Sequence, residues 1–199
     1  AHGVTYLLDA CQSVGQMPVD VQEIGCDFLS ATGRKFLRGP RGTGFLYASR
    51  AAMEHHEPPV LDLHSAEWVA ADRYEMQKSA RRYENWENYI AGKIGLGVAA
   101  DYAMSFGLDA IAERNSELAG DLRERLAAIP GVTLRDAGRE RCAIVTFSHE
   151  RYEPEEVVAR LAAQDIIIGN SGRSSTRLDF ESRDLPALCR AAVHYLNTE

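Results

Sequence analysis

The sequence has no apolar stretch long enough to cross a membrane, which takes about 20 consecutive apolar residues. Its four cysteines are scattered, and none belongs to a Cys-x-x-Cys pair or to a Cys/His spacing typical of metal sites. Excess positive charge is missing too, since 29 acidic residues outnumber 22 basic ones and the net charge is −7. We therefore expect no membrane and no nucleic-acid partner, and the scattered thiols favour a reducing, cytoplasmic compartment.

Internal repeats and low-complexity segments are also absent. Hydrophobic residues make up 45% and charged residues 26% of the chain, as in ordinary globular proteins. The sequence opens without an initiator Met or a signal peptide, and Asn197, Thr198 and Glu199 at its end look like the start of a helix. We interpret the 199 residues as a fragment of a longer protein.

Short apolar runs bounded by Gly, Pro and polar residues predict buried strands in the first part of the chain, and helical apolar spacing predicts long helices in its middle. Residues 51–88 lack a regular pattern, and we expect a packed loop region there. We place a domain change near Gly107, between two predicted helices. The predicted strands are 4–8, 27–31, 43–48, 132–135, 142–147 and 165–168, and the predicted helices are 90–104, 108–128, 154–163 and 184–196.

Three polar residues at predicted strand ends indicate chemistry. Asp9 and Gln12 follow the first strand, and Lys35 follows the second and leads into the glycine-rich run 39–44. A lysine condenses with aldehydes to a Schiff base, and a carboxylate can pair with a protonated pyridine nitrogen. Each feature alone is weak, because an Asp at a strand end is usually a cap and a lone Lys is usually solvated. The glycine run also fails the phosphate-loop pattern, since no Lys-Ser/Thr follows its last Gly.

In this order and spacing, Asp9-Ala10-Cys11-Gln12, Lys35 and Gly39-Pro40-Arg41-Gly42-Thr43-Gly44 resemble the class V aminotransferase family of fold-type I pyridoxal 5′-phosphate (PLP) enzymes. Compared with the family pattern, one extra residue lies between the lysine and Gly39-Pro40. The family includes cysteine desulfurases, isopenicillin N epimerase-like proteins and carbon–sulfur lyases. The resemblance continues at Arg82-Tyr83-Glu84, at Gly95-Leu96-Gly97 and over residues 190–199.

The resemblance implies an α/β fold. Residues 1–106 would be the C-terminal part of the PLP-binding large domain, with a mixed, mostly parallel sheet and helices. Residues 107–199 would be a smaller α+β C-terminal domain, truncated at its last helix. The N-terminal half of the family would be missing.

The resemblance also implies the roles of the site residues. Asp9 would pair with the pyridinium nitrogen, and Gln12 would hydrogen-bond the ring hydroxyl oxygen. Lys35 would carry the cofactor as an internal aldimine and then shuttle the proton of a substrate carbanion. Thr32 and Arg34 would contact the cofactor phosphate.

Two arginines complete the implied site. Arg190 would bind the α-carboxylate of a small amino-acid-like substrate, a role that suits a bidentate guanidinium. Arg177, together with Arg173, would read a second acidic group, although solvated loop arginines explain the pattern equally well. We expect a homodimer with its site near the subunit interface.

Two departures from the family pattern bear on the reaction. Glu87 stands where desulfurases have a threonine that reaches the partner's cofactor phosphate, and a carboxylate there would repel a phosphate. The loop 169–177 contains no cysteine where the persulfide-forming cysteine of desulfurases is expected. We therefore expect an aminotransferase or a carbon–sulfur lyase, and no cysteine desulfurase activity.

Two alternatives stay open at this stage: a PLP-dependent epimerase, and a non-catalytic fragment that needs a partner chain. A metal site is not expected, because His55, His56 and His64 fit no standard ligand spacing.

Overall fold

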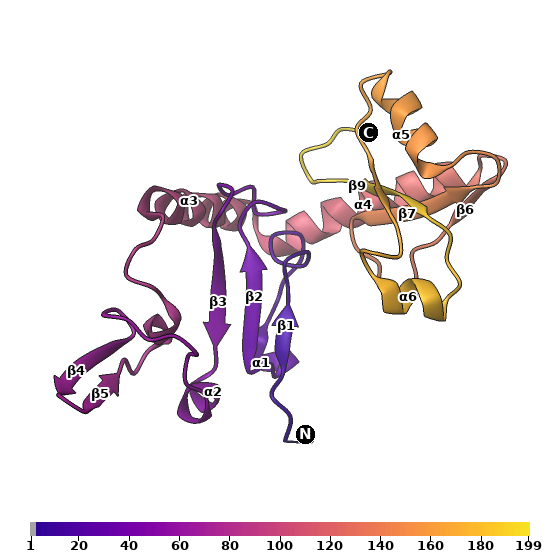
Figure 1. Cartoon of the computed structure of the whole chain (residues 1–199). Helices are drawn as coiled ribbons and strands as arrows, with labels where there is room; N and C mark the ends of the chain where they lie inside the picture. The colour runs from indigo at the N-terminus through magenta and orange to yellow at the C-terminus, as the bar shows by residue number, and fades with distance from the viewer. Residues whose placement is uncertain (1–2) are drawn as a thin grey trace. The chain divides into compact units, whose positions relative to one another are not determined.

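The computed structural model describes residues 3–199, which form two compact units (Figure 1). The first unit ends at Asp109 and the second begins at Ala110. The division lies within the helical region where the sequence predicts a domain change. The assignment of 1–106 and 107–199 to the two domains of a PLP enzyme stays a prediction.

The first unit is built around a three-stranded sheet, followed by a small hairpin and a long helix. Its elements are β1 (Leu7–Asp9), α1 (Val21–Ile24), β2 (Phe28–Thr32), β3 (Gly44–Ala48), α2 (Arg50–His55), β4 (Ala66–Ala70), β5 (Arg73–Met76), the 3-10 helix η1 (Ala80–Tyr83) and α3 (Ile90–Phe106).

The sheet is mixed, with strand order β1-β2-β3. β1 runs parallel to β2, and β2 runs antiparallel to β3. Side chains of β2 alternate between buried and half-buried, as expected for a strand with one face on a core. That core consists of Ala10, Cys26, Leu29 and Ala31. The first predicted strand is shorter than expected and is not buried, since Leu7 is 58% exposed.

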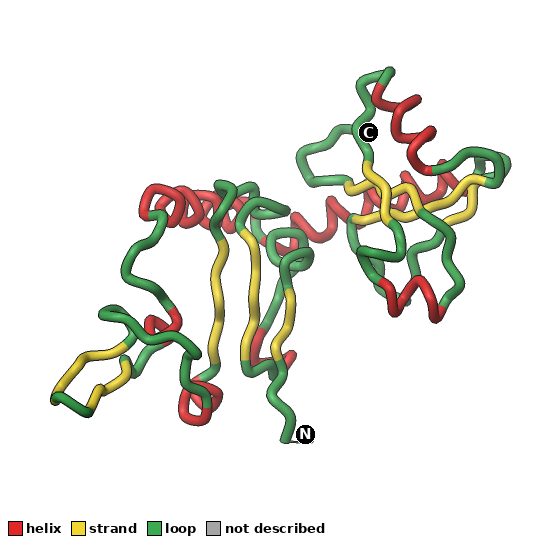
Figure 2. Tube along the Cα trace, viewed as in Figure 1, coloured by secondary structure: helices red, strands yellow, loops and turns green. Residues whose placement is uncertain are grey.

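The stretch expected to be an irregular loop contains more structure than the sequence indicates. Figure 2 shows that loops dominate it but are interrupted by α2, the hairpin β4–β5 and η1. Arg82 in η1 is buried, and it donates from Nε to Gln77 O and from one terminal nitrogen to Met53 O, both at 2.7 Å. This side chain therefore ties η1 to α2, and we assign it a structural role.

The second unit has a four-stranded sheet with strand order β6-β7-β9-β8, in which every pairing is antiparallel. α5 packs against β8 and β9. Its elements are α4 (Leu108–Ala127), β6 (Val132–Leu134), β7 (Ile144–His149), α5 (Pro154–Ala162), β8 (Gly169–Ser171), α6 (Arg177–Ser182) and β9 (Leu188–Ala192).

Three predictions for this unit were wrong. Residues 165–168 form no strand, and β8 begins only at Gly169. The helix expected at 184–196 is the strand β9, which pairs with β7 on one side and β8 on the other. The Leu- and Ala-rich sequence favours a helix, but pairing on both sides outweighs this weak preference. No helix begins at Asn197 either, because residues 193–199 are turns and coil.

Within residues 3–199 no single helix has the length and apolar content to span a membrane. The broken pair α3 and α4 satisfies that test only when the two helices are taken together. The described residues also bring no three His, Cys, Asp or Glu side chains into a group that could hold a metal ion.

Candidate functional site

Asp9 lies at the end of β1, where the chain turns away from the sheet. Its Oδ1 accepts a hydrogen bond from the backbone N–H of Cys11 at 2.9 Å. That hydrogen bond, a second one from the Cys11 thiol and the nearby charge of Lys35 all lower the pKa of Asp9, and together they outweigh desolvation. Asp9 is therefore an anion at neutral pH, as a partner for a protonated ring nitrogen must be.

Lys35 lies in the turn that follows β2. Because β1 and β2 are parallel, with Asp9 opposite Ser30, the segments after both strands leave the same edge of the sheet. Gly39 N donates to Gly33 O at 2.7 Å and Arg38 N donates to Lys35 O at 2.8 Å, so the turn closes on its own backbone. Parallel pairing thus brings Asp9 and Lys35 within electrostatic reach of each other.

Arg38 lies between Lys35 and the glycine-rich run, where the family pattern has one residue fewer. Arg38 has a φ of 58°, in the left-handed region that non-glycine residues rarely adopt. Its guanidinium lies over the ring of Tyr102 in α3, 4.8 Å from the ring centre. This contact fixes the far end of the lysine turn against the helix.

Gly15 packs against the backbone of the lysine turn, the segment after β2 that contains Lys35, and the sequence alone did not reveal this contact. It has a φ of 89°, and a Cβ atom added to it would lie 2.6 Å from Leu37 N and 2.8 Å from Phe36 C. Only a glycine allows the two backbones to approach this closely. In the sequence, the position of Gly15 shortly after Gln12 indicated a turn, but it did not indicate a contact with the segment that contains Lys35.

The other predicted cofactor residues lie around the same edge of the sheet. Thr32 ends β2, and its Oγ1 lies 3.4 Å from Thr43 O in the glycine-rich loop. Arg34 and Gln12 are exposed. Within residues 3–199, the side chains of Gln12, Arg34 and Lys35 form no hydrogen bond or ion pair with one another or with other residues, so their polar groups are available to a ligand.

Arg190 and Arg177 belong to the second unit and are described within it. Arg190 lies on the strand β9, not on a helix, and is half-buried. In the described part of the chain its guanidinium has no ion-pair partner. Arg177 at the start of α6 pairs with Glu181 at 3.2 Å, and its side chain is 69% exposed. Arg190 is therefore the better candidate for holding a carboxylate.

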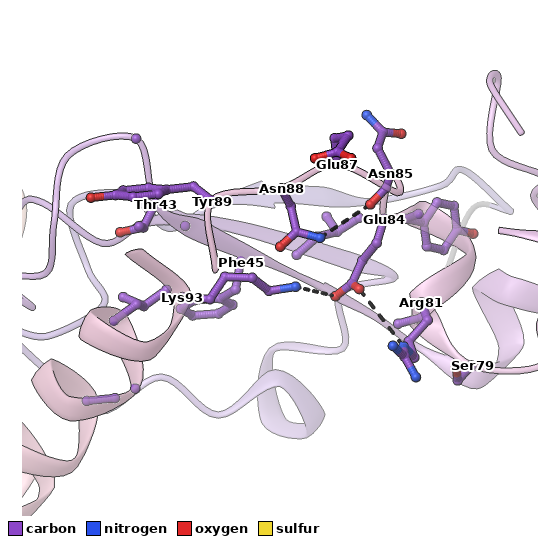
Figure 3. A pocket seen from close by; sticks show the side chains of 18 residues that line it. Thr43, Phe45, Ser79, Arg81, Glu84, Asn85, Glu87, Asn88, Tyr89 and Lys93 are labelled. Carbon is purple, nitrogen blue, oxygen red and sulfur yellow. Dashed lines mark hydrogen bonds and ion pairs between the residues drawn. The ribbon is translucent and has the colours of Figure 1, made fainter. Parts of the chain in front are cut away.

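The first unit also has a pocket of about 860 Å³ that none of the predicted cofactor residues lines. In Figure 3, Lys93 of α3 and Arg81 of η1 both reach toward the carboxylate of Glu84. The Glu84 oxygens lie 3.5 Å from Lys93 Nζ, 4.0 Å from Arg81 Nε and 3.4 Å from His64 Nε2. Glu84 thus organises the wall of this pocket.

Glu87 lines the same pocket and is exposed. Its carboxylate adds negative charge near Asn85 and Asn88, and the Asn88 side chain donates to the backbone carbonyl of Asn85 (Figure 3). The expectation that Glu87 repels a phosphate is untested and stays a prediction.

The comparisons with known proteins bear on the whole chain. The family model for aminotransferase class-V matches residues 1–199. The chain belongs to this family. A probable cysteine desulfurase of Halalkalibacterium halodurans is 33% identical over 198 residues, which cover 100% of this chain and 48% of the relative. A probable cysteine desulfurase of Methanothermobacter thermautotrophicus is 31% identical and is matched over 50% of its length by 98% of this chain. This class V aminotransferase chain thus spans about half the length of the curated relatives it matches.

Solved structures give the same fold. The apo cysteine desulfurase of Thermococcus onnurineus NA1 superposes with a TM-score of 0.89 at 27% identity, over 98% of this chain and 49% of that one. A cystine C–S lyase in complex with its product, cysteine persulfide, has a TM-score of 0.78 at 21% identity over 94% of this chain and 47% of its own. These likenesses confirm the α/β fold with mixed sheets of the fold-type I PLP enzymes.

The relatives' names correct one expectation. The loop without a cysteine led us to expect no cysteine desulfurase activity, yet both curated relatives above and the solved structure at 27% identity are cysteine desulfurases. The loop of this class V aminotransferase chain, residues 169–177, still contains no thiol. Its lack of a thiol is therefore an insufficient reason to exclude the activity.

Proposed function

We propose that the chain is part of a PLP-dependent enzyme that acts on an amino acid, of the aminotransferase or carbon–sulfur lyase type. One observation carries the proposal: the parallel pairing of β1 with β2 brings Asp9, at the end of β1, and Lys35, in the turn after β2, to the same edge of the sheet. The donor set fits the cofactor, because it offers an anion, an amine, a hydroxyl and a guanidinium at one edge of the sheet. PLP bound there would supply a ring that withdraws electrons from the substrate α-carbon.

Each residue around the ring would contact the part of the cofactor that suits its charge and hydrogen-bonding groups. Asp9 would place its carboxylate against the ring nitrogen, and Gln12 would offer its amide to the ring hydroxyl. Lys35 Nζ would hold the cofactor and then take up and return the proton at the substrate α-carbon. This step requires the neutral amine, because an ammonium group cannot accept a proton.

The anionic ends of cofactor and substrate would be held by separate groups. Thr32 Oγ1 and the exposed Arg34 would bind the phosphate, with Arg34 supplying the opposite charge. Arg190 would bind the substrate α-carboxylate; this is supported by its half-buried position on β9 and by the absence of an ion-pair partner within residues 3–199. We keep Arg177 as a second substrate contact that must first release Glu181.

Cleavage of a carbon–sulfur bond is the reaction that the relatives' names favour, with desulfurases and a C–S lyase among them. Incubation with L-cysteine separates the outcomes by their products. Alanine with sulfur bound to the protein indicates desulfurase activity, pyruvate with sulfide indicates a lyase, and a keto acid that retains sulfur indicates an aminotransferase. Loss of stereochemistry without any of these indicates the epimerase.

The test of the site itself is borohydride reduction after incubation with PLP, followed by peptide mass mapping. We expect a pyridoxyl group on Lys35 that disappears in Lys35→Ala. Lys93→Ala is the matched control, because Lys93 is in the same unit and pairs with Glu84 away from the proposed site. Labelling scattered over surface lysines, or none, would refute cofactor binding by this chain and favour a fragment that needs a partner.

The homodimer and the cytoplasmic location stay predictions. The first unit exposes apolar side chains on α3, with Ile94 65%, Val98 64% and Met104 67% exposed, and this supports a covering partner. Light scattering coupled to gel filtration tests the dimer. A monomer that still binds PLP stoichiometrically would exclude a site that depends on two subunits.

A further inference from the structure

We propose that Leu96 of α3 is a positioning residue: one of its methyl groups lies against both ends of the lysine turn and so fixes the place from which Lys35 reaches the cofactor. The inference rests on the proposed function, because it concerns the same lysine. It adds a residue to which the resemblance assigns no role.

The lysine turn is closed by two glycines. Gly39 N donates to Gly33 O at 2.7 Å, and Gly33 N donates to Thr43 O at 2.9 Å. Lys35 therefore lies inside a backbone loop that begins and ends at a glycine. Because a lysine side chain is a flexible four-carbon stem, the place of its amine depends on where this loop holds the Lys35 Cα atom.

A single methyl group of Leu96 fits against both of these glycines. A Cβ atom added to Gly33 would lie 2.7 Å from Leu96 Cδ1, and one added to Gly39 would lie 3.1 Å from the same atom. The two glycines thus leave free the space that the methyl group fills. Leu96 is half-buried, as expected for a side chain that is covered on one side.

Neighbouring contacts hold α3 close enough for Leu96 to reach the turn. A Cβ atom added to Gly95 would lie 2.8 Å from Pro40 Cγ, so the helix also approaches the glycine-rich run closely. Six residues after Leu96, the ring of Tyr102 lies under the Arg38 guanidinium. Figure 1 shows α3 lying across the end of β2 and the start of β3, the two strands that the turn and the glycine-rich run connect. A displacement of α3 would therefore open the turn.

The contact is tested first without cofactor, by hydrogen exchange of the amide at position 39, which is bonded to Gly33 O. Leu96→Ala removes the methyl group but keeps a strong helix former, and we expect this amide to exchange at least about fivefold faster. Val98→Ala is the matched control and should leave the rate unchanged, because Val98 is on the same helix and is 64% exposed.

A double-mutant cycle shows whether the two residues act through one contact. Gly39→Ala adds a methyl group 3.1 Å from Leu96 Cδ1 and should itself speed the exchange of the turn amides, after correction for intrinsic rates. Combined with Leu96→Ala it should speed exchange by less than the product of the two single effects, because each change acts on the same contact. A double variant whose effect equals that product would contradict the contact.

The positioning role is tested by competition among the three lysines of the chain, Lys35, Lys78 and Lys93. At limiting PLP, borohydride reduction and peptide mapping give the ratio of pyridoxyl groups on Lys35 to those on the exposed Lys78. We expect Leu96→Ala to lower this ratio at least about tenfold, because a reacting group loses much of its advantage when it is displaced. Leu96→Met has nearly the same volume and should restore most of the ratio.

Val19→Ala separates positioning from a general loosening of the first unit. Val19 packs against the core of this unit, so its truncation destabilises the same fold without removing an atom from the contact between Leu96 and the turn. We expect the labelling ratio to stay close to that of wild type. An equal fall in Val19→Ala and Leu96→Ala would reduce Leu96 to a structural residue.

The outcomes separate the two proposals. An unchanged exchange rate at position 39 in Leu96→Ala, or an unchanged labelling ratio, would overturn the role of Leu96 while cofactor binding stands. A wild-type chain that attaches no PLP to Lys35 would overturn the proposed function and the positioning role with it, even where hydrogen exchange shows that Leu96 closes the turn.

Discussion

Substituting Gly15 by alanine should destabilise the first unit more than its location in a short turn suggests. Two effects add. A φ of 89° costs an alanine roughly 1–2 kcal/mol. The new Cβ would also lie 2.6 Å from Leu37 N, and overpacking of this kind typically costs about 1–3 kcal/mol. The lower entropy of the unfolded alanine chain returns about 0.4–1 kcal/mol, so we expect a net loss of about 2–4 kcal/mol.

Gly25→Ala is the matched control for this substitution. Gly25 ends α1 with a φ of 68°, and a Cβ atom there would meet nothing within 4 Å. It shares the backbone cost but not the clash, so its net loss should be about 1 kcal/mol or less. The difference between the two variants isolates the contact between the Gly15 turn and the lysine turn.

Hydrogen exchange of the β2 amides is the assay. β2 is paired on both sides, so its slowest amides exchange only when the sheet opens. A loss of about 1.4 kcal/mol corresponds to about tenfold faster exchange. The two variants should differ by at least about 1 kcal/mol, so Gly15→Ala should exchange at least about five times faster than Gly25→Ala. Equal rates in the two variants would show that the turn yields without strain, and the reasoning would be refuted.

Three further predictions concern carboxylates. The pKa of Asp9 is lower in the folded chain than its unfolded value of 3.8. Asp9 therefore contributes fully to stability above pH 3.8, and this contribution is lost as the pH falls through the folded pKa. An NMR titration midpoint for Asp9 at or above 3.8 would contradict this. Asp136→Ala should lower the free energy of unfolding of the second unit by about 3–5 kcal/mol in urea titrations, because it leaves the buried Arg123 without the carboxylate that lies 2.7 Å from its Nε. Asp121→Ala is the control: it breaks the exposed pair with Arg125 on α4 and should cost about 0.5 kcal/mol. Asp62→Ala removes the acceptor of the Trp86, His64 and Ser65 backbone amides, so limited proteolysis should cut residues 84–89 faster than in wild type; an unchanged rate would show that other contacts hold this segment.

The sequence predicted the long helices α3 and α4 well because their apolar spacing is long and regular. Residues 108–128 have this pattern, and α4 spans Leu108–Ala127 with Ile111 and Leu118 buried. β9 was missed because its Leu and Ala residues favour a helix, and only pairing with β7 and β8 makes it a strand. The hairpin β4–β5 was missed because most of its side chains are exposed on both faces, which leaves no alternating pattern to detect.

For the site, the spacing of the motifs indicated Asp9, Gln12 and Lys35 as cofactor residues. The family match supports the resemblance on which that prediction rests. The neighbours that hold these residues in place could not be predicted in the same way. The contact of Gly15 with Leu37 depends on how two turns approach each other, and this approach follows from the pairing of β1 with β2. Local sequence does not contain that information.

The register in which β1 pairs with β2 also determines whether the proposed site can form. Three residue pairs, from Leu7 with Phe28 to Asp9 with Ser30, define the register of the two strands. A slip by one residue would displace Asp9 along its neighbour by about 3.3 Å and turn its side chain to the other face of the sheet. Such a molecule would keep most of its helices and its second unit but would separate the carboxylate from the lysine. The fraction of molecules in which these three pairs form in the correct register therefore sets the fraction that can be active, independently of the overall free energy of unfolding.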